Sequence, residues 1–143
     1  PDVTVGFNTQ LTYKTWTLAL NGHGGFGNYV YNNNYSRLSL LSDLWTNNFI
    51  ANRVDGAYEL GFTEAQYFSD YFVQDASYFK IDNITLSKQF KIDHYQGISL
   101  FFTCQNVATI TKYKGIDPEI FSGIDNQMYP RPRNYILGVK FNF

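Results

Sequence analysis

The ten residues from Asn134 to Phe143, NYILGVKFNF, decide the fold class of this chain. Apolar side chains alternate with polar or small ones, and only Ile136 departs from the pattern. The apolar members are Tyr135, Leu137, Val139, Phe141 and Phe143. A period of two predicts a β-strand with one apolar and one polar face. About 9–11 residues also suffice for a tilted strand to cross a bilayer. Because the sequence ends on Phe143 within this strand, we expect the last strand of an outer-membrane barrel.

The composition favours the same class. Aromatic residues make up 19% of the chain and charged residues 16%, with 12 Tyr, as expected if aromatic girdles mark two membrane interfaces. Mean hydropathy is only −0.29, and no apolar run approaches the ~18 residues of a membrane helix. The chain is therefore either a soluble β protein or a barrel wall whose apolar residues are hidden by alternation.

Charge and cysteine content exclude several other classes. The formal net charge is −1 and the densest basic pair is Arg131 and Arg133, so no nucleic-acid partner is expected. Cys104 is the single cysteine, which excludes an intrachain disulfide and a thiolate metal site. The sequence has no signal peptide and opens at Pro1 without an initiator Met, as expected of a piece of a longer chain.

Alternation predicts an all-β fold of about five antiparallel strands. They cover Val3 to Tyr13, Thr15 to Asn21, Ser77 to Ser87, Ile98 to Gln105, and Asn134 to Phe143. The first two strands form a hairpin around Lys14-Thr15, with one apolar face on both arms. The strands of a β-sandwich would show the same alternation of apolar and polar side chains. A barrel is favoured by aromatics near the strand ends, namely Tyr13, Trp16, Tyr135 and Phe143.

The third strand changes phase. Phe79 and Ile81 occupy odd positions, whereas Ile84 and Leu86 occupy even ones. A β-bulge near Asp82-Asn83 produces such a slip of one residue. The alternative, equally open at this point, is that Phe79 and Ile81 face a barrel lumen under a plug.

The connections alternate between short and long. Gly22 to Gly25 contains strand breakers, and regular strand alternation is lost from Gly22 to about Gln74. Lys88 to Gly97 is a short polar connection, and Asn106 to Pro132 is a second long loop. Outer-membrane barrels have short periplasmic turns and long extracellular loops. Five strands would leave open edges in lipid. We therefore expect the C-terminal piece of a larger barrel, or a chain that pairs with others.

Several short motifs follow one another in a recognisable order. They are Pro1 to Gly6 with Tyr13-Lys14, Asp75 to Leu86 (DASYFKIDNITL), Gln105-Asn106, Tyr113-x-Gly115-x-Asp117-Pro118-Glu119, and Tyr129 to Arg133 (YPRPR). Their order and the terminal Phe143 resemble the C-terminal segment of SusC/RagA-type TonB-dependent outer-membrane transporters. The resemblance covers nearly all of the chain outside Gly25 to Tyr71. Lys88 departs from the family pattern, which has an aromatic residue there, and Phe101 falls on the side expected to be polar.

The resemblance implies that residues 1–143 are the C-terminal part of a large transmembrane β-barrel of about 22 strands. Such proteins import glycans or peptides across the outer membrane of Bacteroidetes. Their partners would be a SusD-like surface lipoprotein, and TonB through regions not in this chain, together with the plug, the remaining barrel strands and outer-membrane lipid. The C-terminal apolar residues, Tyr135 to Phe143, would be the assembly signal.

Candidate contact residues lie in the first long loop. Tyr29, Tyr31, Trp45, Tyr58 and Tyr67 are candidates for stacking on sugar rings or packing against a lipoprotein. Tyr35 and Tyr71 belong to the same aromatic set. The alternative is that these rings fill the interior of the loop itself.

The residues give no support for catalysis or for a cofactor. His23 and His94 lack an evident partner in the sequence, and Gly22 to Gly27 lacks the Lys-Ser/Thr of a P-loop. Asp117, Glu119 and Asp125 offer oxygen ligands but not the spacing of an EF-hand, so a solvated turn is expected rather than a calcium site. Two alternatives to the transporter remain: a soluble carbohydrate-binding β-sandwich and a passive porin-like barrel.

Overall fold

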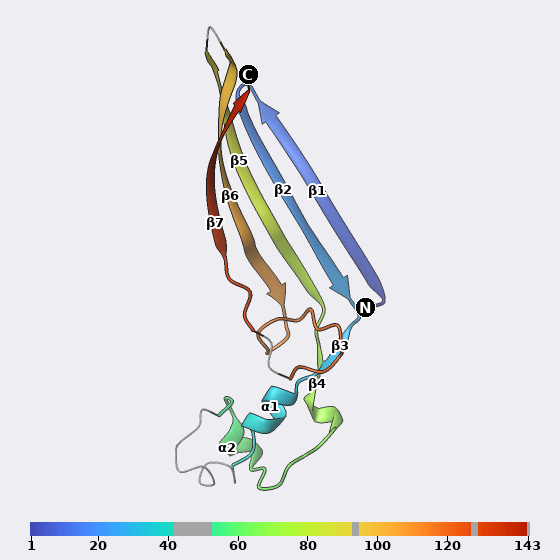
Figure 1. Ribbon diagram of the computed structural model, residues 1–143. Helices are drawn as coiled ribbons and strands as arrows, with labels where there is room; N and C mark the ends of the chain where they lie inside the picture. The colour runs from blue at the N-terminus through green and yellow to red at the C-terminus, as the bar shows by residue number, and fades with distance from the viewer. Residues whose placement is uncertain (42–52, 93–94, 127–128, 143) are drawn as a thin grey trace. The chain divides into compact units, whose positions relative to one another are not determined.

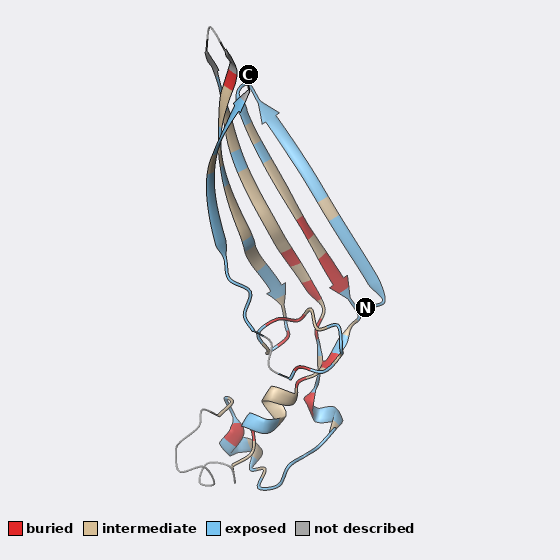
Figure 2. Cartoon of the chain, in the orientation of Figure 1, coloured by how far each residue is buried: buried red, intermediate tan, exposed pale blue. Residues whose placement is uncertain are grey.

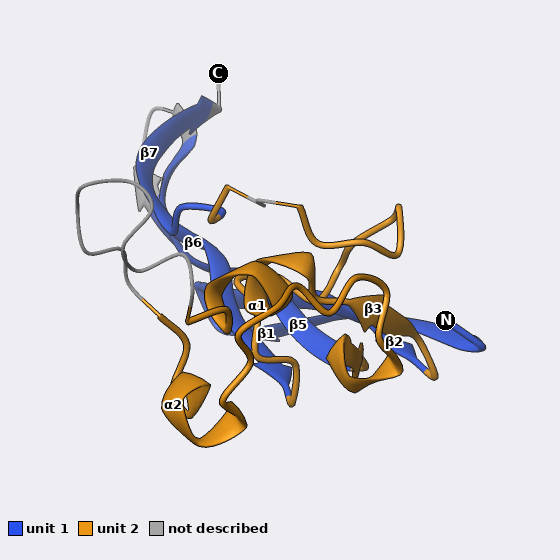
Figure 3. Ribbon diagram, turned by 90° about the horizontal axis from the view of Figure 1, so that it is seen from below, with its two compact units in different colours: residues 1–26, 78–111, 131–143 blue, residues 27–77, 112–130 orange. Residues whose placement is uncertain are grey.

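The computed structural model describes residues 1–41, 53–92, 95–126 and 129–142. The chain forms two compact units. Residues 1–26, 78–111 and 131–143 make up the first, which we call the sheet unit, and residues 27–77 and 112–130 the second, the loop unit. Figure 1 traces the chain and Figure 3 colours the two units.

The sheet unit is a single five-stranded antiparallel sheet with the order β1-β2-β5-β6-β7. Its strands are β1 (Val3–Tyr13), β2 (Trp16–Phe26), β5 (Tyr78–Ile92), β6 (Tyr95–Thr111) and β7 (Asn134–Asn142). The five predicted strands are all present, and β1 has the predicted bounds. Lys14 closes the predicted turn between β1 and β2 with a φ of 56°.

The predicted bounds of three strands are wrong, because each of these strands is longer than its sequence pattern. β2 continues through Gly22 to Gly25, which pair with Thr4 to Phe7 on one side and Tyr78 to Ile81 on the other. β5 and β6 occupy most of the expected connection from Lys88 to Gly97, and β6 runs on to Thr111. Pairing with two neighbours overrides the low strand propensity of glycine.

The glycines at the end of β2 leave room for aromatic rings. Phe7 and Phe79 stack with their centroids 5.3 Å apart and their planes at 9°. A Cβ on Gly22 would collide with the Phe7 ring and with the carbonyl oxygen of Lys80. Glycine is required here because two neighbouring strands approach its backbone closely.

Gly22→Ala is expected to lower the free energy of unfolding of the protein by about 1–3 kcal/mol, since the backbone must shift to admit the methyl group. Gly6→Ala is the matched control, because a Cβ on Gly6 would meet nothing within 4 Å. Urea titration of both variants measures the difference. Equal midpoints would contradict the steric account.

The predicted β-bulge is confirmed. The register of β5 shifts between Ile81 and Asn83 against both of its neighbours. Phe79 and Ile81 therefore lie on the same face as Ile84 and Leu86, and the alternative in which they face the lumen is wrong. On the opposite face, Phe101 covers Gly138, its partner across β6 and β7, which explains an aromatic ring on the polar side.

The loop unit has its own small core (Figure 2). A two-stranded sheet pairs β3 (Tyr29–Tyr31) with β4 (Val73–Asp75). The described helical segments are α1 (Asn33–Leu38), α2 (Ala57–Leu60) and η2 (Asp70–Phe72). The core groups Val30, Ala76 and Tyr113 with the partly buried Ile120. Within the described ranges, no helix combines the length and apolar character needed to span a bilayer.

Candidate functional site

One face of the sheet unit is apolar across all five strands. The register aligns one row of side chains from strand to strand: Leu11, Leu18, Leu86, Phe102 and Leu137. All five are exposed, by 65% for Leu11 and 71% for Leu137. Contiguous exposed apolar surface of this extent marks contact with lipid or with another protein.

The residues predicted to act in assembly lie on this same face. Tyr135, Leu137, Val139 and Phe141 alternate along β7 and are each at least half exposed. The Tyr135 ring stacks on Phe102 of β6 at a centroid distance of 6.2 Å. Phe143 lies outside the described residues. The structure therefore places the four described residues along one side of β7, the strand at the edge of the sheet.

The opposite face is polar and hydrogen-bonded between strands. Asn83 Nδ2 donates to Asn21 Oδ1 over 3.0 Å, and the hydroxyls of Thr85 and Thr103 are 2.8 Å apart. His23 Nδ1 lies 2.7 Å from Asp82 Oδ2. The pairing of β2 with β5 brings Asp82 to His23 from 59 residues away, a partner that was not evident in the sequence.

The candidate aromatic contacts that the structure describes in the loop unit do not form one cluster. Tyr29, Tyr58 and Tyr67 are highly exposed, Tyr67 by 80%. Tyr31 packs against Phe68 and Phe72 instead, as the interior alternative predicts for that ring. Trp45 lies outside the described residues. Three of the five candidates are thus available at the surface of the loop unit.

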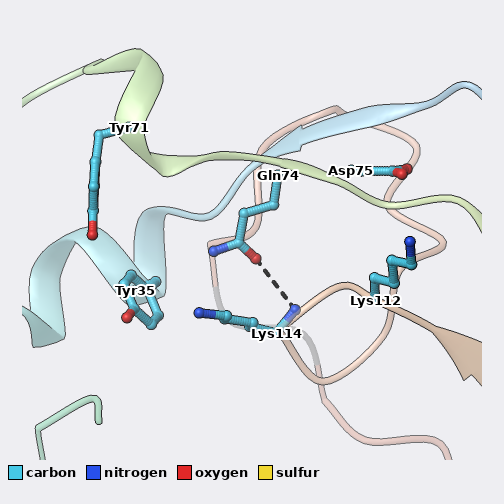
Figure 4. Close-up of a pocket in the computed structure, with 6 residues that line it drawn as sticks. All are labelled: Tyr35, Tyr71, Gln74, Asp75, Lys112 and Lys114. Atoms are coloured by element: carbon cyan, nitrogen blue, oxygen red, sulfur yellow. Dashed lines mark hydrogen bonds between the residues drawn. The ribbon is translucent and has the colours of Figure 1, made fainter. Parts of the chain in front are cut away.

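A polar pocket of about 340 Å³ opens in the loop unit (Figure 4). It is lined by Tyr35, Tyr71, Gln74, Asp75, Lys112 and Lys114. Gln74 Oε1 accepts a hydrogen bond from the backbone amide of Lys114 over 3.2 Å. Lys114 Nζ lies 5.7 Å from the centre of the Tyr35 ring, a cation–π arrangement.

The pocket combines two ammonium groups with one carboxylate. Hydrogen bonds from Ser77, aided by the nearby Lys112 charge, hold the pKa of Asp75 below its usual value, so this side chain is ionised at neutral pH. The remaining positive charge and the two tyrosines suit a polar ligand. The aromatic pattern indicated Tyr35 and Tyr71, whereas Lys112 and Lys114 were missed because they come from a distant part of the chain.

A buried carboxylate ties the two segments of the loop unit together. Asp125 is only 2% exposed. Its side chain accepts hydrogen bonds from the Tyr113 hydroxyl over 2.7 Å and from Asn34 Nδ2 over 3.1 Å. Its backbone amide donates to the Tyr31 carbonyl over 2.9 Å. Burial and the Asp125 carboxylate raise the pKa of Tyr113 far above its ordinary value, so the phenol remains a donor.

The acidic turn from Asp117 to Asp125 is not solvated as expected. Asp117 is buried, and its Oδ1 accepts a hydrogen bond from the backbone amide of Glu119 over 2.9 Å. Pro118 is also fully buried. Among the residues that the structure describes, no three His, Cys, Asp or Glu side chains gather as a metal site would require. The turn is a packed structural element.

The comparisons with known proteins identify the chain. TonB-dependent receptor SusC of Bacteroides thetaiotaomicron is 36% identical over 99% of this chain. This chain is a segment of a SusC/RagA-type TonB-dependent receptor. TonB-dependent receptor P26 of Formosa agariphila is 25% identical over 100% of the segment. No family model matches.

Solved structures share the fold of this receptor segment. The RagAB peptide importer in its closed-closed state superposes with a TM-score of 0.78 at 20% identity over 98% of the segment. Its open-open state gives a TM-score of 0.76 at 21% identity. The segment spans only 15% of SusC, 17% of P26 and 17% of the closed-closed importer chain.

Two of the motifs that suggested the SusC/RagA family contact each other. Asn106 Nδ2 donates to the Pro132 carbonyl over 2.7 Å, and Arg133 Nη2 donates to the Val107 carbonyl over 2.8 Å. Asn106 takes a left-handed φ of 53°, which Asn tolerates better than most residues. These bonds fix the chain just before β7 against β6. The Gln-Asn and YPRPR motifs of this receptor thus have a shared structural role.

Proposed function

We propose that the receptor containing this segment imports glycans or peptides across the outer membrane, with energy supplied through TonB. The exposed apolar row from Leu11 to Leu137 carries this proposal, because lipid is the environment that satisfies such a surface. Similarity to SusC, a TonB-dependent receptor, and a fold shared with the RagAB peptide importer support it.

In this proposal the sheet unit is the C-terminal wall of a barrel of about 22 strands, the size of outer-membrane transporters. β1 and β7, at the two edges of the sheet, pair with the remaining barrel strands, because open edges are not tolerated in lipid. The apolar face contacts outer-membrane lipid, and the polar face with His23 and Asp82 contacts the plug. A sandwich would bury the apolar face against a second sheet, so its exposure favours a barrel.

The loop unit would lie outside the cell. Its exposed rings, Tyr29, Tyr58 and Tyr67, are proposed contacts for a SusD-like lipoprotein or for the nutrient. Trp45 remains a candidate for the same role. Tyr31 has a packing role in the loop unit, so its substitution would act on the fold of the loops before any contact.

The apolar residues Tyr135 to Phe143 are the proposed assembly signal. Support comes from the four described members, which share one exposed face of the edge strand β7. Phe143→Ala is expected to lower the amount of assembled barrel in the membrane, measured as the heat-modifiable band in gel electrophoresis. An unchanged yield would contradict this role.

Nutrient-limited growth tests the proposed function. A strain lacking the receptor gene, the complemented strain and a strain lacking TonB are grown with glycans or with peptides as the limiting nutrient. Loss of growth on one nutrient in both deletion strains supports TonB-dependent import and identifies the substrate class. Uptake that persists without TonB favours the porin-like barrel, and normal growth without the receptor overturns the proposal.

A further inference from the structure

Among the described side chains of the sheet unit, Lys88 is the cation that interrupts the apolar face. Lys88 lies on β5 and pairs with Trp16 of β2 on one side and Leu100 of β6 on the other. Because β5 is the central strand, both lateral neighbours of Lys88 belong to this chain. Its position between them therefore does not depend on the remaining strands of the barrel.

Aromatic rings hold the Lys88 ammonium at this surface. Its Nζ lies 4.9 Å from the centre of the Trp16 ring and 4.9 Å from that of Phe90. Lys88 forms no ion pair with a carboxylate of the described residues. The nearest acidic group of the strand, Asp82, is instead bound to His23 on the polar face. Cation–π contacts orient the ammonium and leave its hydrogen-bond donors available.

A second cation adjoins the same row. Lys14 Nζ lies 5.2 Å from the centre of the Tyr13 ring, and Tyr13 pairs with Trp16 across β1 and β2. Tyr13, Trp16 and Lys88 thus follow one another across three strands, beside the short turn at Lys14. Tyr and Trp concentrate at the membrane–water interface.

The level of Lys88 in the membrane follows from its charge. A lysine facing lipid is costly at the bilayer midplane but nearly neutral at the interface, and a long side chain can extend its ammonium to the headgroups. The row of Tyr13, Trp16 and Lys88 therefore belongs at the level of the lipid phosphates, on the side of the short turns. These phosphates supply the negative charge that Lys88 lacks within the described protein.

We propose that Lys88 and Lys14 bind the phosphate of an anionic phospholipid in the leaflet on the side of the short turns. The acyl chains of this lipid would lie along the adjacent row that contains Leu18 and Leu86. An anionic headgroup is favoured over a zwitterionic one because Lys88 and Lys14 bring two positive charges to it, and neither forms an ion pair with a carboxylate of the described residues. This inference rests on the proposed membrane location of the sheet unit.

Native mass spectrometry of the full-length receptor tests the proposal. The purified receptor in detergent is titrated with phosphatidylglycerol or phosphatidylcholine, and bound lipids are counted. Lys88→Gln keeps most of the side chain but removes the charge, and is expected to weaken phosphatidylglycerol binding roughly fivefold. Lys140→Gln on the polar face of β7 is the control, because Lys140 pairs with Ser99 away from the apolar face.

The outcomes separate this proposal from the others. Equal phosphatidylglycerol binding by Lys88→Gln and Lys140→Gln overturns the proposal. It is also overturned if Lys88→Gln weakens phosphatidylcholine binding as much as phosphatidylglycerol binding, since this would indicate altered packing. Competition by glycerol phosphate as effective as by the lipid would indicate a site for free phosphate and overturn the lipid assignment. A heat-modifiable band confirms that each variant is folded. A receptor that proved soluble without detergent would instead refute the membrane location.

Discussion

Ile84→Lys is expected to lower the free energy of unfolding of the membrane-inserted receptor by about 2–4 kcal/mol, the cost of a lipid-facing lysine near the bilayer midplane. Ile84 lies on the apolar face of the central strand β5, between Leu20 and Cys104. It is four residues along β5 from Lys88, in the direction away from the short turn, and so is deeper in the proposed bilayer than the row that carries the natural lysine.

Ser87→Lys is the control for this prediction. Ser87 lies on the same strand but on the polar face, where it pairs with Thr17 and Phe101. Its substitution introduces the same charge without placing it in lipid. Urea titrations of the two variants in lipid vesicles measure the difference. Similar losses would mean that the apolar face does not contact lipid, because the lysine on that face would then cost no more than the same charge on the polar face.

Asp125→Ala is expected to destabilise the loop unit by about 3 kcal/mol, because it leaves buried donors without an acceptor. The Tyr113 hydroxyl loses its 2.7 Å bond and Asn34 Nδ2 its 3.1 Å bond. Faster hydrogen exchange of the Tyr31 amide, which bonds to Gly123, would report the opening of the loop unit. Asp70→Ala is the control, since Asp70 is exposed. Equal exchange rates in both variants would contradict a tethering role for Asp125.

The hydrogen bond between Tyr113 and Asp125 makes the stability of the loop unit depend on pH under alkaline conditions. Burial and the hydrogen bond to Asp125 raise the pKa of Tyr113 in the folded state above the ordinary tyrosine value of about 10. Below pH 10 the phenol is protonated in both the folded and unfolded states, so it contributes no pH dependence. Above pH 10 only the unfolded state releases the proton, and the stability of the loop unit falls.

Local patterns predicted those parts of the structure that local forces determine. The bounds of β1, the turn at Lys14 and the bulge near Asp82 all follow from a side-chain period of two. Gly22 to Gly25 could not be predicted as a strand, because its conformation depends on partners distant in the chain. The pairing of His23 with Asp82 could not be predicted either, because the two residues are 59 positions apart in the sequence.

The pocket and the buried hydrogen bonds of the loop unit could not be predicted for a similar reason. The tyrosines were visible as an aromatic-rich loop, but Lys112 and Lys114 are separated from Tyr35 by most of the chain. Asp125 was assigned to a solvated turn because nothing in its neighbourhood indicates burial. Its partner Asn34 is 91 residues away.

The pairing of β3 with β4 has a consequence for the entropy of folding. β2 and β5 are separated by a long connection, and the cost of joining them rises with the logarithm of its length. Tyr29 pairs with Asp75 inside that connection, only a few residues from the pair of Gly25 and Tyr78. Once β3 has paired with β4, only a few residues separate that pair from the ends of β2 and β5. We therefore expect β2 and β5 to pair with little further loss of conformational entropy.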